Sequence, residues 1–228
     1  NSTGLPDGNH FSSAKDLATM TSLLIDNFPE TYSLYKEKYF TFNNIRQPNR
    51  NRLLWKDNSS DGVKTGHTES AGYCLISSAK RNDMRLIAVV AGAKSDKERF
   101  NDTQRLLEYG FRFYSTQEVI KKDNALKDVD VWGGKKNLVS LGAENNIKLT
   151  LPRTTFKNIT ISYDFQNNLR APIKEGQTLG TLVIKDGEKT LHTENLVALN
   201  DVEAKGFFGR LWASLVLWFR GLFSLGEA

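Results

Sequence analysis

The sequence is poor in cysteine and histidine. Cys74 is the only cysteine among 228 residues, which excludes an intramolecular disulfide. Because Cys74 stands in an apolar segment and no histidine–asparagine pattern accompanies it, we expect a small buried side chain rather than a nucleophile. The three histidines, His10, His67 and His192, have no spacing that would join them in a metal site. Neither a metal nor a cofactor is therefore expected.

Arginine-rich stretches and long apolar runs are missing as well. The net charge of +5 and the isoelectric point of about 9.2 suit anionic lipid, a cell-wall polymer or nucleic acid, and cannot choose among them. Because the body of the chain has no arginine-rich run with interleaved aromatic residues, no nucleic-acid partner is expected. The chain opens on a loop-like segment without methionine or a signal peptide, so we expect further polypeptide upstream.

Segments with helix and strand patterns alternate in residues 1–115. Ser13 precedes an acidic first turn and apolar residues at helical spacing, which predicts a helix. A second helix is expected after Ser95, where Ser-Asp-Lys-Glu has the pattern of a capping box. We predict an α/β domain whose strands begin near residues 39, 64, 72 and 85. Asn43-Asn44 is a turn signal after the first strand, and Leu53-Leu54-Trp55 is expected to be a short buried run. The polar residues Lys80-Arg81-Asn82-Asp83 are expected to form the turn of a hairpin that joins the last two strands.

Residues 116–203 contain only short alternating segments separated by turns. Gly133-Gly134 and Asp186-Gly187 have the composition of hairpin turns. The spacing predicts a separate all-β domain of roughly 85 residues, a sandwich or a small barrel. Its clearest strands are expected at residues 129–132, 147–151, 159–163 and 179–184.

The last segment, residues 204–228, has one wide apolar face. Arg210 and Arg220 limit its unbroken apolar run to residues 211–219, which is too short to span a bilayer. We predict an amphipathic helix that lies on a membrane surface, with the arginines near anionic lipid. The alternatives are a terminal helix docked on its own protein or on a dimer partner, and a true membrane span. The anchoring residues would be Phe207, Phe208, Leu211, Trp212, Leu215, Trp218, Phe219, Leu222 and Phe223.

Lys64, Thr65 and Gly66 form the motif with the clearest chemistry. An ammonium group and a neighbouring hydroxyl can hold a substrate carboxylate by charge-assisted hydrogen bonds. A glycine leaves room for a substrate backbone beside the strand, and the backbone N–H that follows can point at a developing oxyanion. The tripeptide alone is a weak signal, because a surface strand with a solvated lysine has the same pattern.

Further segments extend this motif into a longer resemblance. The run at residues 3–18 contains a Gly-Leu turn, His-Phe-Ser-Ser-Ala and a helix start, and residues 49–55, 61–68 and 85–90 follow in order. These segments resemble the low-molecular-mass penicillin-binding proteins, the D-alanyl-D-alanine carboxypeptidases. The β domain and the amphipathic tail are similar to the protein 5 and 6 subgroup, so the chain resembles the C-terminal portion of such an enzyme.

The resemblance implies roles for five residues. Lys64 and Thr65 would bind the substrate's C-terminal carboxylate, with Gly66 beside the substrate backbone. The backbone N–H of His67 would be one oxyanion-hole donor, while its imidazole is expected to be structural rather than a base. Arg50 matches an arginine that family members place near the site.

The family's nucleophile and general base come from a Ser-x-x-Lys motif upstream of this region, and its Ser-x-Asn loop also precedes the Gly-Leu turn. Ser-x-x-Lys occurs here at Ser12, Ser33 and Ser77, and none has the expected context. Ser77 and Lys80 lie on a predicted strand, where residues three apart face opposite ways. We therefore expect a missing N-terminal part of the same enzyme to supply the nucleophile, and this chain alone to form no acyl-enzyme.

The function implied by the resemblance is a serine-type D-Ala-D-Ala carboxypeptidase of peptidoglycan maturation. It would remove the terminal D-alanine of pentapeptides through an acyl-serine intermediate, and β-lactams would acylate the same serine. The expected location is the periplasmic face of a bacterial inner membrane, as a peripheral protein. The alternatives are a β-lactamase or endopeptidase of the same superfamily, and a non-catalytic, membrane-attached scaffold that binds peptidoglycan.

The predicted fold class is α+β. Residues 1–115 would form part of a serine transpeptidase/β-lactamase-like α/β domain, residues 116–203 an all-β, sandwich-like domain, and residues 204–228 the amphipathic helix.

Overall fold

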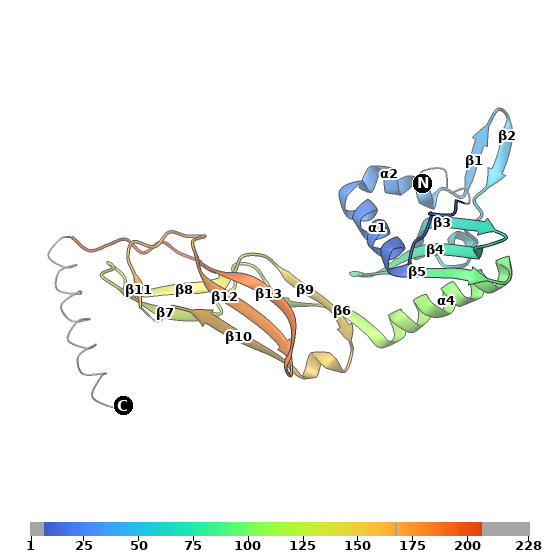
Figure 1. Cartoon of the computed structure of the whole chain (residues 1–228). Helices are drawn as coiled ribbons and strands as arrows, with labels where there is room; N and C mark the ends of the chain where they lie inside the picture. The colour runs from blue at the N-terminus through green and yellow to red at the C-terminus, as the bar shows by residue number, and fades with distance from the viewer. Residues whose placement is uncertain (1–6, 167, 207–228) are drawn as a thin grey trace. The chain divides into compact units, whose positions relative to one another are not determined.

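The computed structural model describes residues 7–166 and 168–206. Its contacts divide the chain between Thr116 and Gln117 into two compact units, which Figure 1 shows in blue to green and in yellow to red. The predicted anchor residues, from Phe207 onward, lie outside the described residues.

Helix α1 (Ala14–Asn27) begins where its cap predicts. The Ser13 hydroxyl accepts the N–H of Asp16, and the Asp16 carboxylate accepts the N–H of Ser13, so both halves of a capping box are present. Pro29 then starts a short helix, α2 (Pro29–Ser33), which leads into the 3₁₀ turn η1 (Leu34–Lys36). The helix predicted from Ser13 is confirmed.

The first unit is built on an antiparallel sheet of order β3-β4-β5. The strands are β3 (Ser60–Thr68), β4 (Gly72–Arg81) and β5 (Met84–Ala93). The predicted hairpin is confirmed, but its turn is shorter than expected. Lys80 and Arg81 pair with β5 and continue the strand, which leaves only two residues for the turn, Asn82 and Asp83.

Helix α4 (Asp96–Phe113) packs on β4 and β5, while α1 contacts β5, and Figure 1 shows the two helices on either side of the sheet. The helix lies so close to the sheet that a Cβ on Gly110 would approach Leu86 Cδ1 to 2.4 Å. The capping box predicted after Ser95 is only half formed. The Ser95 hydroxyl accepts the N–H of Glu98, but the Glu98 carboxylate accepts the N–H of Lys94 instead of that of Ser95. The core of this unit comprises Leu53, Leu75, Ala79, Met84, Ala88, Leu107 and Phe111.

Two small elements precede β3. The hairpin of β1 (Tyr39–Phe42) and β2 (Ile45–Pro48) turns through Asn43 and Asn44, whose φ angles of 51° and 63° are the left-handed values that asparagine tolerates. Helix α3 (Leu53–Lys56) contains the predicted buried run. Leu53 and Leu54 are buried there, whereas Trp55 is 37% exposed and meets the edge of Tyr39.

The described part of the second unit consists of strands and one 3₁₀ turn, η2 (Thr155–Lys157). One sheet has six strands in the order β10-β12-β13-β8-β7-β11, and β6 pairs with β9 in a second sheet. The strands are β6 (Tyr114–Ile120), β7 (Lys127–Trp132), β8 (Leu138–Ala143), β9 (Ile147–Pro152), β10 (Ile159–Phe165), β11 (Leu169–Arg170), β12 (Thr178–Asp186) and β13 (Lys189–Ala198).

The second unit has a hydrophobic core of its own. Leu141, Leu182, Ile184 and Leu196 are fully buried in it. Strands β8 and β13 lie at the centre of the large sheet, yet their sequences lack the clean alternation that revealed β7, β9, β10 and β12. Their burial follows pairing with neighbours distant in sequence. The protein is thus a strand-rich α+β protein, as predicted.

Candidate active site

Strand β3 places the Lys-Thr-Gly motif at an edge of the first unit's sheet. Among the residues that the structure describes, β3 pairs with β4 alone. Lys64 and Gly66 are exposed, whereas Thr65 between them is 8% exposed. The three residues therefore follow the two-residue period of a strand, with the lysine on the solvent side.

The Lys64 side chain bends back along its own strand. Its Nζ donates a 2.6 Å hydrogen bond to the carbonyl oxygen of Thr65. The ammonium group is consequently held at the sheet edge. A carboxylate arriving there would replace a neutral acceptor by a charged one, which gives a stronger hydrogen bond.

The His67 imidazole is engaged in a ring contact. It lies 3.9 Å, centroid to centroid, from the ring of Tyr73, its cross-strand partner on β4. This contact fixes the side chain against the sheet, which leaves the main chain of His67 as the group that faces the edge of the motif.

Arg99 of α4 reaches the other side of this strand pair. Its side chain is 8% exposed, and Nη1 donates to the carbonyl oxygens of Gly66, at 2.9 Å, and Cys74, at 3.2 Å. Nη2 donates to the Asp96 carboxylate, one helical turn earlier. A buried cation thus holds the backbone of the predicted site from the side of the sheet that α4 covers.

Sequence reasoning missed Arg99, although a signal exists. The buried residues of α4 are Arg99, Thr103, Leu107 and Phe111, which recur at intervals of four. A charged residue in the buried stripe of an amphipathic helix requires a partner, because burying an unpaired charge is costly.

A second polar network lies at the start of β3. The Tyr32 hydroxyl donates to Asp61 at 2.6 Å, and Arg85 binds both oxygens of the same carboxylate, at 2.9 and 2.8 Å. Arg85 also donates to Ser78 at 2.6 Å. A Cβ on Gly62 would lie 2.8 Å from the Tyr32 hydroxyl, so glycine is needed for this packing. The network holds the strand in place ahead of Lys64.

Tyr32 should make the first unit sensitive to alkali. Burial, and then the hydrogen bond to Asp61, raises the pKa of Tyr32 well above its usual value. The stabilisation from the neutral hydroxyl is full below the unfolded pKa of about 10 and is lost as pH rises toward the folded pKa. We expect the free energy of unfolding of Tyr32→Phe, measured in urea, to fall less steeply between about pH 9.5 and 11 than that of the parent. Exposed Tyr109 provides the control, because Tyr109→Phe should keep the parent slope; equal slopes for all three proteins would contradict the assignment.

Arg50 and Asn51 lie just before helix α3 in the chain. Arg50 is exposed, and Asn51, which sequence reasoning passed over, is 1% exposed. The Asn51 side-chain amide donates to the Gly62 carbonyl at 2.8 Å, and its Oδ1 accepts the N–H of Leu53. Asn51 therefore ties the segment that carries Arg50 to β3.

The three Ser-x-x-Lys serines each donate to a main-chain carbonyl. Ser12 donates to Ser13 at 3.5 Å, Ser33 to Glu30 at 2.6 Å and Ser77 to Gly62 at 2.9 Å. Ser77 is fully buried, whereas Lys80 is exposed. The geometry gives none of them the arrangement of a lysine-activated nucleophile.

A hollow of about 560 Å³ lies beyond the motif in the first unit. It is bordered by Asp7, residues 10–12, Leu17, the β3–β4 turn, Cys74 and residues 91–92 of β5, and Lys64 to His67 do not line it. Cys74 is half-buried rather than buried as predicted, because the strand irregularity between Tyr73 and Leu75 brings it to the border of this hollow.

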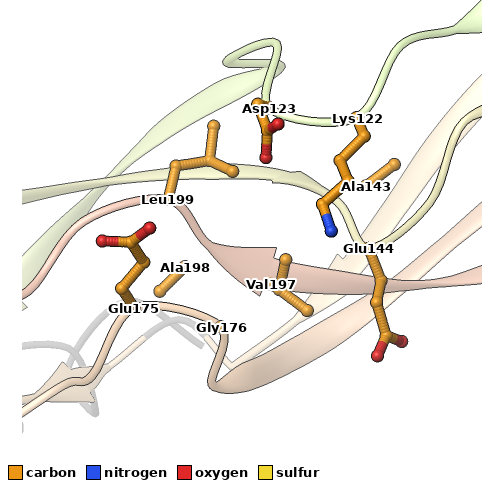
Figure 2. Close-up of a pocket in the computed structure, with 9 residues that line it drawn as sticks. All are labelled: Lys122, Asp123, Ala143, Glu144, Glu175, Gly176, Val197, Ala198 and Leu199. Atoms are coloured by element: carbon orange, nitrogen blue, oxygen red, sulfur yellow. The ribbon is translucent and has the colours of Figure 1, made fainter.

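A second hollow, of about 360 Å³, lies in the β unit (Figure 2). Lys122 and Asp123 extend into it, while the carboxylates of Glu144 and Glu175 lie at opposite ends of the group. The acidic side chains do not converge on one point, and within residues 7–166 and 168–206 no cluster of three or more potential ligands could hold a metal ion.

Comparison with known proteins shows the family. The model of D-alanyl-D-alanine carboxypeptidase matches residues 1–95, and that of the penicillin-binding protein 5 C-terminal domain matches residues 114–204. The chain belongs to the D-alanyl-D-alanine carboxypeptidase family. The predicted resemblance to penicillin-binding proteins of the 5/6 type is thereby confirmed.

Relatives in this carboxypeptidase family are similar over nearly the whole chain. D-alanyl-D-alanine carboxypeptidase DacC of Escherichia coli (strain K12) is 46% identical over 97% of this chain and 57% of its own length. DacA of Haemophilus influenzae is 42% identical over the same shares. The crystal structure of penicillin-binding protein 5 from Haemophilus influenzae superposes with a TM-score of 0.74 at 40% identity, over 87% of this chain and 59% of that one. The chain thus spans little more than half the length of these carboxypeptidases.

The last feature to compare with the structure of this carboxypeptidase-family chain is the predicted membrane segment. None of its helices is long and apolar enough to cross a lipid bilayer. Of the amphipathic anchor predicted for residues 204–228, residues 204–206 are described and are not helical, since Ala204 pairs with Gly134 and the Lys205 N–H donates to the Gly133 carbonyl. The residues from Phe207 onward lie outside the described part of the chain.

Proposed function

We propose that this chain belongs to a serine-type D-Ala-D-Ala carboxypeptidase of peptidoglycan maturation and supplies its substrate-binding edge strand and its β domain. The observation that carries the proposal is the position of Lys64, Thr65 and Gly66 on the open edge of β3, in a chain similar over 97% of its length to carboxypeptidase DacC. The first unit would then be part of the transpeptidase-like catalytic domain, and the β unit a sandwich-like domain.

The motif would recognise the carboxylate end of a pentapeptide or a β-lactam. Lys64 Nζ, already at the edge, exchanges the Thr65 carbonyl for the substrate carboxylate. A second hydrogen bond from the Thr65 hydroxyl would have to reach this carboxylate at the strand edge, because Thr65 is buried on the opposite face of β3. Arg50 adds positive charge near the same carboxylate. Gly66 lets the substrate backbone lie against β3 without a side chain between them.

The His67 N–H would stabilise the oxyanion of acyl transfer. A serine outside this chain attacks the carbonyl of the penultimate D-alanine, the terminal D-alanine leaves, and water hydrolyses the acyl-serine ester. The upstream part of such an enzyme, which carries Ser-x-x-Lys and Ser-x-Asn, is then the partner that the edge strand needs.

The same proposal places the protein at the periplasmic face of a bacterial inner membrane. Residues 207–228 would form the amphipathic helix that lies on anionic lipid, which suits their aromatic side chains and their two arginines. The substrate, peptidoglycan, lies on that side of the membrane.

Labelling with a fluorescent penicillin tests the proposal. In a chimera, this chain replaces the 227-residue match in Escherichia coli DacC, so that DacC supplies the nucleophile. We expect covalent labelling of the chimera and release of D-alanine from a D-Ala-D-Ala peptide, and no labelling of residues 1–228 alone. Circular dichroism verifies that the chimera is folded.

A non-catalytic scaffold remains the second candidate, because all three Ser-x-x-Lys hydroxyls of this chain are bonded to main-chain carbonyls. A folded chimera that binds peptidoglycan but takes up no penicillin would support the scaffold and contradict the carboxypeptidase.

A further inference from the structure

The feature that the proposed reaction leaves unexplained is the cation beneath the motif. Arg99 and Asp96 belong to α4, which falls between the stretches matched by the two family models, residues 1–95 and 114–204. Nevertheless, the Arg99 guanidinium donates to the carbonyl oxygen of Gly66 in the motif itself.

The bonded carbonyl shares a peptide group with the proposed oxyanion donor. Atoms C and O of Gly66 and N and H of His67 lie in one plane, and this peptide bond is not among the two cis bonds of the described chain. In a trans peptide group the N–H points opposite to the C=O. A group that holds the Gly66 oxygen on one side therefore directs the His67 N–H to the other side, away from Arg99.

We propose that Arg99 is a positioning residue that orients and polarises the His67 N–H as an oxyanion donor, through its hydrogen bond to the Gly66 carbonyl; this inference rests on the proposed carboxypeptidase function. A charge-assisted hydrogen bond to the oxygen withdraws electron density from the peptide group and makes its N–H a stronger donor. Because the guanidinium is buried, water screens this effect little.

The surroundings of Arg99 hold the guanidinium in place. Asp96 accepts from Nη2 and is itself paired with Arg52, at 2.9 Å, on the segment next to Arg50. The centroid of the Tyr73 ring, which packs against His67 at a tilt of 36°, lies 5.3 Å from the Arg99 guanidinium carbon. The side chain and the main chain of His67 thus depend on the same cluster.

The geometry requires arginine rather than any cation. The planar fork serves two carbonyls and one carboxylate at once, whereas a lysine ammonium on a flexible stem is a point charge that cannot reproduce this arrangement. Arg99→Lys keeps the charge and removes the fork. Arg81→Lys is the matched control, since Arg81 also makes several hydrogen bonds, to Asp57 and Ser59, but at the far end of β4 from Cys74.

The first test needs no activity. In ¹H–¹⁵N spectra of residues 1–228, Arg99→Lys should shift the amide resonances of His67 and Leu75, whose peptide groups contain the two bonded carbonyls. Arg81→Lys should leave both resonances in place. If the His67 amide moves no more in Arg99→Lys than in the control, Arg99 does not act on this peptide group.

The second test uses the DacC chimera with a D-Ala-D-Ala peptide. Arg99→Lys should lower kcat about 10-fold or more, as expected for a misaligned oxyanion donor, and leave KM within about threefold. Arg81→Lys should keep the parent kcat once its fold is verified. An unlabelled parent chimera would contradict the proposed function, whereas a labelled parent with an undiminished kcat in Arg99→Lys would overturn the role of Arg99 alone.

Discussion

Replacing Lys64 by alanine is expected to lower the kcat/KM of the DacC chimera for a D-Ala-D-Ala peptide about 100-fold. The change removes the ammonium group that would pair with the substrate carboxylate and leaves a carboxylate without its counter-charge at the sheet edge. Penicillin acylation should slow by a similar factor, because the β-lactam carboxylate would use the same site. Second-order acylation rates with a fluorescent penicillin measure this directly.

The structure also predicts that this loss is not a loss of stability. Lys64 is exposed, and its one described hydrogen bond is to the carbonyl of the next residue, so Lys64→Ala should leave the midpoint of thermal unfolding nearly unchanged. Lys80→Ala, which changes another exposed lysine on the neighbouring strand, provides the control and should label at the parent rate. A parent-like acylation rate in Lys64→Ala would remove the basis of the proposed function.

Replacing Leu182 by alanine is expected to destabilise the β unit by about 3 to 5 kcal/mol. Leu182 lies in the central part of β12, between β10 and β13, and is fully buried. Truncation removes buried methyl groups and leaves a cavity that paired strands on both sides cannot close. The thermal midpoint of the β-unit transition should fall by more than about 10 °C in calorimetry.

The contrast with Leu138 tests the reason for that effect. Leu138 begins β8 in the same unit and is 51% exposed, so Leu138→Ala should change the free energy of unfolding by less than about 1 kcal/mol. Equal losses for the two variants would mean that the core of this unit is not where the structure places it.

Local patterns identified those elements whose stability arises within a few residues. Ser13 predicted α1 because its hydroxyl satisfies the N–H of Asp16, three residues away. The Asn43-Asn44 pair predicted the β1–β2 turn because asparagine tolerates the left-handed backbone of both positions. Residues 80 and 81 were misassigned to the turn, because charged side chains at a strand end have the same composition as a turn.

Local patterns could not predict the central strands of the large sheet or the partners of the buried polar residues, because both depend on long-range pairing. β8 and β13 are central strands whose neighbours, β7 and β12 among them, decide their burial, so their own sequences carry little alternation. Asn51 and Arg99 are polar residues whose partners on β3 lie 11 and 33 positions away. The spacing of buried residues on α4 indicates that Arg99 needs a partner, but neither this spacing nor the sequence around Asn51 identifies which residue the partner is.

The sequence by itself determined the family of this protein, its two-part α+β organisation and the residues of the Lys-Thr-Gly motif, because residue identity and local spacing carry that information. Only the tertiary structure decided where the motif's groups point: Lys64 lies along the sheet edge, Thr65 is buried, and the peptide group between Gly66 and His67 is held from below by Arg99. The physical reason is that a hydrogen bond or a buried charge acts through space, between atoms that only the folded chain brings together.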